Sequence, residues 1–130
     1  MKILIGYDGS NSAKDALKLA KDRAKVFNAT VDVITSMVGA NNDQYEDVRQ
    51  AELGLEFTKT MLEEDNIPCE THLLVRGYSP GEELVQFAKY NQINEIIVGV
   101  RRKSKVGKLL LGSTAQHIIL KAPCPVVSIK

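Results

Sequence analysis

The sequence predicts a single doubly wound α/β domain spanning residues 1–130, in which helices cover both faces of a parallel sheet. Three observations lead to this prediction. Short apolar runs alternate along the chain with longer segments of helical period, the order that joins parallel strands through helices. The length of 130 residues suits one domain. A composition of 44% hydrophobic and 25% charged residues is that of an ordinary globular protein.

Charge and cysteine usage exclude several classes of protein. The formal net charge is +1, so the chain as a whole is not drawn to nucleic acid or membrane. The apolar run Ile3–Ile5 is far too short for a signal-peptide core or a membrane span, and we expect a cytoplasmic location. Cys69 and Cys124 lie far apart without a CxxC spacing, which indicates neither a disulfide framework nor a zinc site.

The first strand and helix are predicted from the amino-terminal segment. Ile3–Tyr7 is an apolar strand that ends in the turn cluster Asp8–Ser10. Apolar residues then recur every three or four positions over Ala13–Phe27, which predicts one buried helical stripe. Ser12, with Asp15 three residues later, resembles a capping box and predicts that the helix starts there.

The next segment is predicted to contain a strand, a long helix and another strand. Thr30–Thr35 is a second strand, and Val38–Asp43 has the composition of a loop. A long helix follows with its apolar side over Val48–Leu62, and the acids on its other sides are expected to be a solvated face. Pro68–Val75 alternates loosely between polar and apolar residues and predicts the third strand.

The carboxyl-terminal elements carry the clearest signals. Ser79–Glu82 combines a serine cap, proline at the first helical position and a glutamate three residues after the cap, and its helix continues to Tyr90. Glu95–Gly99 contains the continuous apolar run of a strand that is buried on both faces. Ser113–Leu120 is a last helix and Pro125–Ile129 a final strand.

Five strands in strict alternation with four helices leave few topologies, because crossovers between parallel strands are right-handed. We expect a flavodoxin-like or half-Rossmann arrangement with strand order 3-2-1-4-5. Ligands of such sheets bind beyond the carboxyl ends of the strands, where the winding direction reverses. The first and fourth strands flank that point, so Asp8 and Gly99 are predicted to face one crevice.

A basic loop follows the fourth strand. Five of the 17 lysines and arginines fall between positions 101 and 108 without an intervening acid, which predicts a local anion site. Gly99 and Gly112 let backbone approach a phosphate closely, and Ser113 opens a helix whose amino-terminal end favours negative charge. The alternative is structural: Ser113 and Gln116 have capping spacing, and Gly112 then only makes a turn.

At this point the chain resembles a known family. Gly99, the basic loop, Leu109–Ser113 and Pro123–Val127 are similar to the carboxyl-terminal part of universal stress proteins, and Ile3–Ser10 is similar to their first strand and loop. The resemblance covers essentially the whole chain. It implies a half-Rossmann fold like that of the adenine nucleotide alpha hydrolase-like proteins.

ATP-binding members of that family carry a Gly-x2-Gly-x9-Gly-Ser/Thr loop. This chain keeps Gly99 and Gly112-Ser113 at the family spacing, but Arg102 replaces the second glycine. The resemblance also implies that Asp8 lies by the ribose or adenine and that Ser36 marks backbone that binds adenine. The predicted nucleotide site consists of Gly6, Asp8, Ser36, Val98, Gly99, Arg101, Arg102, Gly112, Ser113 and Thr114.

The resulting functional hypothesis is a regulatory module of the stress response that binds ATP or a related adenine nucleotide. Magnesium or manganese is expected to be held through the phosphates, with no metal ligand and no catalytic residue from the protein. The final strand, an apolar sheet edge at Val126–Ile129, predicts a homodimer. The resemblance implies the same assembly.

Three alternatives stay open. Arg102 favours an interaction dimer that does not bind ATP. Slow ATP hydrolysis needs a general base, and Asp8 is the only acid near the predicted crevice, while His72 and His117 have no visible partner motif and are expected to be structural. A nucleic-acid role for the basic loop is disfavoured because the loop lacks aromatic residues for stacking on bases.

Overall fold

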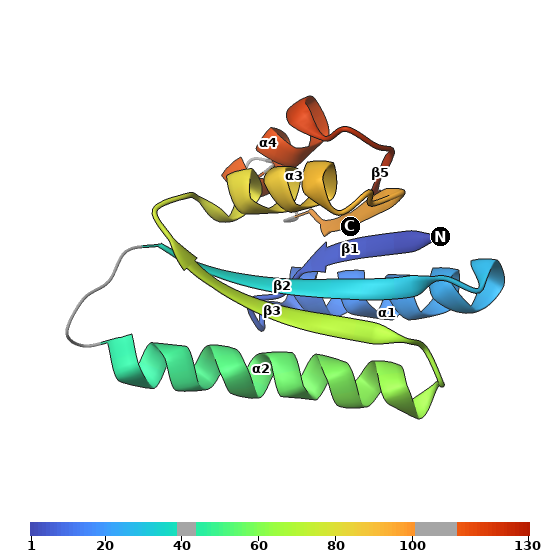
Figure 1. Cartoon of the computed structure of the whole chain (residues 1–130), viewed down its shortest axis with the longest axis horizontal. Coiled ribbons are helices and arrows are strands. Elements are labelled where there is room, and N and C mark those ends of the chain that lie inside the picture. Colours follow the sequence, from blue (N-terminus) through green and yellow to red (C-terminus); the bar gives the residue numbers. More distant parts are fainter. Residues whose placement is uncertain (39–43, 101–111) are drawn as a thin grey trace.

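The computed structural model describes residues 1–38, 44–100 and 112–130. The elements follow in the order β1 (Lys2–Gly6), α1 (Asn11–Phe27), β2 (Thr30–Val38), α2 (Gln44–Glu64), β3 (Cys69–Arg76), α3 (Pro80–Tyr90), β4 (Glu95–Gly99), α4 (Ser113–Lys121) and β5 (Val126–Ile129). The strands pair in parallel in the order β3-β2-β1-β4-β5, which confirms the predicted fold class and strand order (Figure 1).

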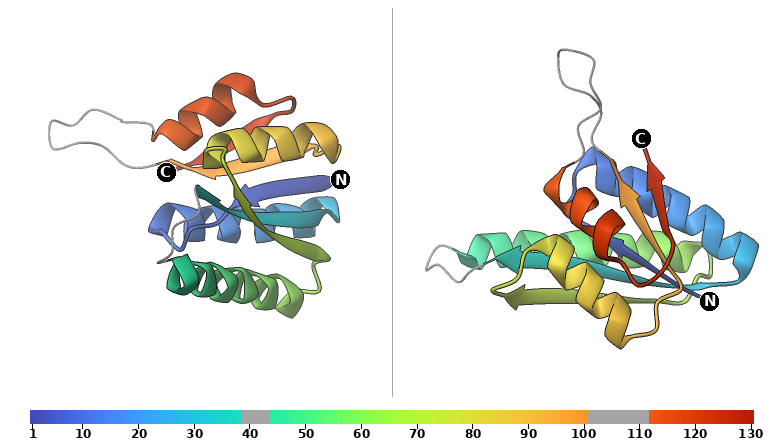
Figure 2. Two further views of the ribbon diagram at one scale, coloured as in Figure 1. Left: turned by 60° about the vertical axis from the view of Figure 1, so that its left-hand side comes forward. Right: turned by 90° about the horizontal axis from the view of Figure 1, so that it is seen from above.

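Helices cover both faces of the sheet, α1 and α2 on one and α3 and α4 on the other (Figure 2). Side chains of a strand alternate between faces, and β1 divides its apolar residues accordingly. Ile3 and Ile5 join the cluster under α1 and α2, whereas Leu4 joins the cluster under α3 and α4. All three side chains are fully buried, so β1 lies at the centre of the fold.

Helix α1 is fixed against β4 near both of its ends. Arg23 donates two hydrogen bonds to the buried carboxylate of Glu95, at 2.5 and 2.6 Å. Near the start of the helix, the carbonyl group of Ser12 lies directly against Gly99. The buried side of α1 is mostly alanine, which lets the helix approach the sheet closely. These contacts bring the amino-terminal end of α1 to the carboxyl end of β4.

The predicted start of α1 is wrong by two residues. The amino-terminal cap is Ser10, whose side-chain oxygen accepts a hydrogen bond from the Ala13 amide at 3.2 Å, and Ser12 lies inside the helix. The preceding turn explains the shift, since Gly9 has a φ of 80° and the Asp8 carboxylate accepts the Ser10 amide at 2.9 Å. That turn places Ser10 in the extended conformation that a cap requires.

Two other boundaries differ from prediction by three residues or more. Strand β2 continues past Thr35 to Val38 because its pairing with β3 runs on through Val38 and Arg76. Helix α2 starts at Gln44, four residues before the first predicted apolar position. Of the predicted loop Val38–Asp43, Val38 belongs to β2 and residues 39–43 lie outside the described ranges.

Within the described ranges, no helix has the length and hydropathy needed to cross a membrane.

Candidate functional site

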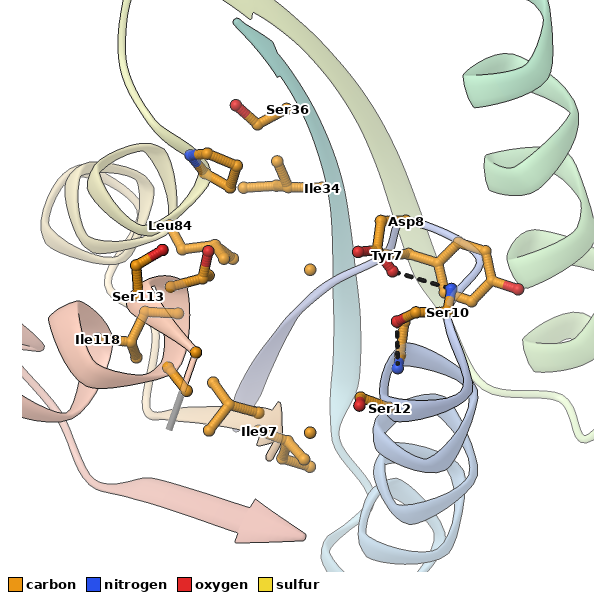
Figure 3. Close-up of a pocket in the computed structure, with 18 residues that line it drawn as sticks. Tyr7, Asp8, Ser10, Ser12, Ile34, Ser36, Leu84, Ile97, Ser113 and Ile118 are labelled. Atoms are coloured by element: carbon orange, nitrogen blue, oxygen red, sulfur yellow. Dashed lines mark hydrogen bonds between the residues drawn. The ribbon is translucent and has the colours of Figure 1, made fainter. Parts of the chain in front are cut away.

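A cavity of about 250 Å³ opens at the carboxyl edge of the sheet, between the ends of β1 and β4 and the starts of α1 and α4. Figure 3 shows Ser113 and Ile118 on one side of it and Asp8, Ser10 and Ser12 on the other. Eight predicted site residues line the cavity, namely Gly6, Asp8, Ser36, Val98, Gly99, Gly112, Ser113 and Thr114. Arg101 and Arg102 lie outside the described residues.

The amino-terminal end of α4 forms one polar part of this wall. Its cap is Gly112, which has no side chain to bond the first turn, and that turn contains no acid. Helix geometry leaves the first amides without partners inside the helix, so they present N–H groups and a partial positive charge at the cavity. The capping alternative for Ser113 and Gln116 is wrong, because the cap is Gly112 and Ser113 is the first helical residue.

At each of the other two helix starts near the cavity, a serine side chain accepts a hydrogen bond from an amide of the first turn. Ser10 caps α1, and Ser79 caps α3 by accepting the Glu82 amide at 3.4 Å. The Ser79 hydroxyl also donates to the Glu82 carboxylate at 2.9 Å, and the predicted serine cap with proline after it is confirmed. Among these three helix starts, α4 alone has neither a side-chain cap nor an acid in its first turn within the described residues.

The glycines of the site have different structural roles. A Cβ atom on Gly112 would meet no atom of the described residues within 4 Å, and its φ of −63° is open to any residue. A Cβ on Gly99 would overlap the Ser12 carbonyl oxygen and lie 2.7 Å from the Ser12 Cβ. The fold itself therefore requires glycine at position 99, whereas glycine at position 112 leaves space beside the cavity.

Ser36 provides a polar group deep in the cavity. Its hydroxyl oxygen is buried and has no hydrogen-bond partner among the described residues. A buried polar atom is normally paired, so this hydroxyl fits a ligand that supplies the missing partner. The same cavity has apolar lining residues that include Ile34, Leu84 and Ile118. A Cβ on Gly6 would approach Leu84 Cδ1 to 2.9 Å, so glycine there keeps the wall open.

Asp8 is the only acid among the described residues that line the cavity. One carboxylate oxygen is held by the Ser10 amide, which fixes the side chain at the rim. The ring of Tyr7 points away from the cavity toward α2 (Figure 3). Burial raises the pKa of the Tyr7 phenol, and the negative charge of Asp8 raises it further, so this phenol stays neutral.

Apart from Val98, sequence reasoning missed the apolar part of the site. Ile34, Leu84, Ile97 and Ile118 come from four different elements and line the cavity together. Each reads in the sequence as an ordinary core residue of its own strand or helix. Ser10 had a local signal, because a serine that follows a glycine in a turn and precedes a helix is a strong cap.

The fold and this cavity define a class: doubly wound α/β proteins whose ligand cavity lies at the switch point beyond β1 and β4. A family model described as the universal stress protein family matches residues 1–130. The chain therefore belongs to the universal stress protein family, as the sequence resemblance indicated.

Individual relatives agree with this assignment. A universal stress protein of Mycolicibacterium smegmatis is 31% identical over 129 residues, which cover 98% of this chain and 96% of that protein. The solved structure of a universal stress protein from Archaeoglobus fulgidus matches with a TM-score of 0.90 and 34% identity, covering 100% and 98% of the two chains. A universal stress protein from the same organism in complex with dAMP matches with a TM-score of 0.84 and 31% identity, over 100% and 98%.

Proposed function

We propose that this chain is an adenine-nucleotide-binding regulatory module that acts as a homodimer in the cytoplasm, with ATP as its nucleotide. One observation carries the proposal: the start of α4, with Gly112 as its cap and Ser113 exposed, lines a cavity that also holds the Ser36 hydroxyl, which has no partner among the described residues. The first feature suits a phosphate and the second suits a base or sugar. The complex of the Archaeoglobus fulgidus relative with dAMP supports the same ligand class.

Different described residues suit the base, the sugar and the phosphates of the nucleotide. The apolar wall formed by Ile34 and Leu84 suits the flat face of adenine, with Ser36 beside it for a hydrogen bond. Asp8, fixed at the rim, suits a ribose hydroxyl. Ser113 and the first amides of α4 suit phosphate oxygens. Magnesium or manganese accompanies the nucleotide through its phosphates, so the protein needs no cage of its own.

Calorimetric titration of the purified protein with ATP, ADP and AMP, each with magnesium, tests the proposal. We expect saturable binding of one nucleotide per chain. Mass spectrometry of small molecules released from the purified protein is expected to find an adenine nucleotide. Absence of both a binding heat and a released nucleotide would support the alternative of an interaction dimer that does not bind ATP, which Arg102 favours.

Hydrolysis is separated from binding by following the products over time. The cavity wall offers Asp8 as its only acid within the described ranges, and that carboxylate already accepts the Ser10 amide. A general base must reach the attacking water, so we expect ATP to remain intact over many binding lifetimes. Release of ADP that is lost in an Asp8→Asn variant would instead show a slow hydrolase.

The homodimer is proposed through β5, the edge strand beside β4. The carbonyl oxygen of Pro125 accepts a hydrogen bond from the Ile96 amide of β4 at 3.1 Å, and that of Ile129 accepts one from the amide of Val100, just after β4, at 2.7 Å. Because backbone groups alternate in direction along a strand, the N–H and C=O of Ser128 point away from β4. Ser128 thus offers an outer edge that a second copy of the strand can pair with.

Replacing Ser128 by proline is expected to convert the dimer to a monomer. Proline removes the outward N–H at an edge while leaving the bonds between β5 and β4 in place. Light scattering after gel filtration measures the mass, and Ser128→Thr, which keeps the N–H, is the matched control. A dimeric Ser128→Pro protein would place the interface elsewhere, and a monomeric wild type would remove the proposed assembly.

A further inference from the structure

Three metal-ligating side chains gather on the sheet at a distance from the nucleotide cavity. Asp32 lies on β2 opposite Glu70 on β3, and His72 is two residues further along β3 on the same face. The two strands are direct neighbours (Figure 1). Asp32 precedes Ser36 by four residues of extended chain, so the cluster lies about 13 Å from the cavity's serine.

The cluster is held in place from inside the protein. Asp32 is 5% exposed, and its Oδ1 lies 3.1 Å from Nε2 of His72. The ring of His72 packs against Phe87 of α3, with centroids 4.8 Å apart. Glu70 lies on the solvent side with 79% of its side chain exposed, and its Oε2 is 3.9 Å from the same nitrogen. Two donors are thus anchored and the third is free to adjust.

These distances match the spacing of ligands around one small cation. Zinc binds imidazole nitrogen and carboxylate oxygen at about 2.1 Å, so tetrahedral ligands lie about 3.4 Å from one another. The separations of 3.1 and 3.9 Å fall on either side of that value, and all three donor atoms lie within 4.8 Å of one another. A small rotation of the exposed Glu70 side chain brings its oxygen to the required distance.

We propose that Asp32, Glu70 and His72 form a binding site for a single Zn²⁺ ion. An imidazole with two carboxylates suits zinc, whereas magnesium and calcium prefer oxygen ligands alone. The ion takes the place of the proton between His72 and Asp32, so the imidazole binds it through a deprotonated Nε2 and any displaced proton passes to solvent. Water completes the coordination on the open side of Glu70.

A zinc ion here links β2 to β3 on the face that α3 covers, at the edge of the sheet. The site shares no described residue with the nucleotide cavity. Zinc binding and nucleotide binding can therefore be measured separately. Either of the two proposals can fail without the other.

The test is titration of the untagged, metal-free chain with Zn²⁺ in competition with a chromophoric chelator. We expect one ion per chain and a rise in melting temperature as zinc is added. His72→Gln is expected to lower the zinc affinity by about 100-fold or more, and Glu70→Gln by about tenfold. Glu70 is exposed, so its variant stays folded even if loss of His72, which leaves Asp32 buried without this partner, destabilises the chain.

His117→Gln is the matched control, because the chain contains only two histidines and His117 lies on α4. It is expected to leave zinc affinity unchanged, and excess Mg²⁺ is expected not to displace the zinc. Failure of the wild type to bind Zn²⁺ in the micromolar range would overturn the proposal. Equal zinc affinity in the wild type and in the Glu70→Gln and His72→Gln variants would overturn it as well.

Discussion

Replacing Gly99 by alanine is expected to lower the free energy of unfolding by about 3 kcal/mol or more. The added methyl group would overlap the carbonyl oxygen of Ser12 and lie 2.7 Å from its Cβ. Helix α1 cannot retreat easily, because Arg23 ties it to Glu95 of the same strand and its alanine side packs closely on the sheet. Either α1 or β4 must shift, and both contribute to the core.

Urea unfolding of the nucleotide-free protein measures this effect. Gly112→Ala is the matched control, since a methyl group there meets no atom within 4 Å in the described part of the chain, and it is expected to cost no more than about 1 kcal/mol. The two variants make the same chemical change at the two glycines that the family loop keeps. Equal unfolding midpoints for them would show that α1 does not pack against Gly99 as described.

The strand order was predictable because it follows from periodicity and from the handedness of crossovers. Glu95–Gly99 gave the clearest strand signal, and β4 has those bounds, because a strand buried on both faces has no polar residues to blur it. Strand β2 was underestimated at its carboxyl end. Ser36 and Val38 extend it only because β3 is there to pair with, and that partner is distant in sequence.

The site was predictable where it depends on local chain chemistry and not where it depends on contacts. Gly112-Ser113 was recognised from its position before a helix, and the structure places it on the cavity wall. The close contact between Gly99 and Ser12 joins residues from different elements, so it leaves no local signal in the sequence. The partnership of Asp32 with His72 was invisible for the same reason, and His72 read as an isolated structural histidine.

The start of α1 shows a second limit of prediction from the sequence. Ser10 and Ser12 both precede the apolar stripe, and Asp15 favoured Ser12 by the capping-box spacing. In the structure the cap is Ser10, because the turn at Gly9 places the Ser10 backbone in the extended conformation of a cap residue. Local sequence preferences alone do not show whether a backbone turn or a side-chain pattern determines where the helix starts.

Replacing Ser113 by aspartate is expected to weaken ATP binding by about 100-fold or more, which corresponds to roughly 2.7 kcal/mol and is within the range for like charges in contact near a protein surface. The aspartate places a fixed negative charge at the uncapped end of α4, where the phosphates are proposed to bind. The same charge suits the helix itself, so stability without nucleotide is expected to stay level or rise by up to about 1 kcal/mol. The affinity for ATP is therefore expected to fall while the stability of the nucleotide-free protein does not.

Two controls separate charge from shape and from helix stability. Ser113→Asn has nearly the size of aspartate without its charge, and we expect it to keep most of the ATP affinity. Gln116→Glu adds the same charge to α4 at a residue that does not line the cavity, and we expect only a few-fold loss there. Tight ATP binding by Ser113→Asp would mean that the phosphates lie away from α4. An equal loss in Ser113→Asn would mean that a hydroxyl contact or the space beside Gly112 controls the affinity, with the helix charge contributing little.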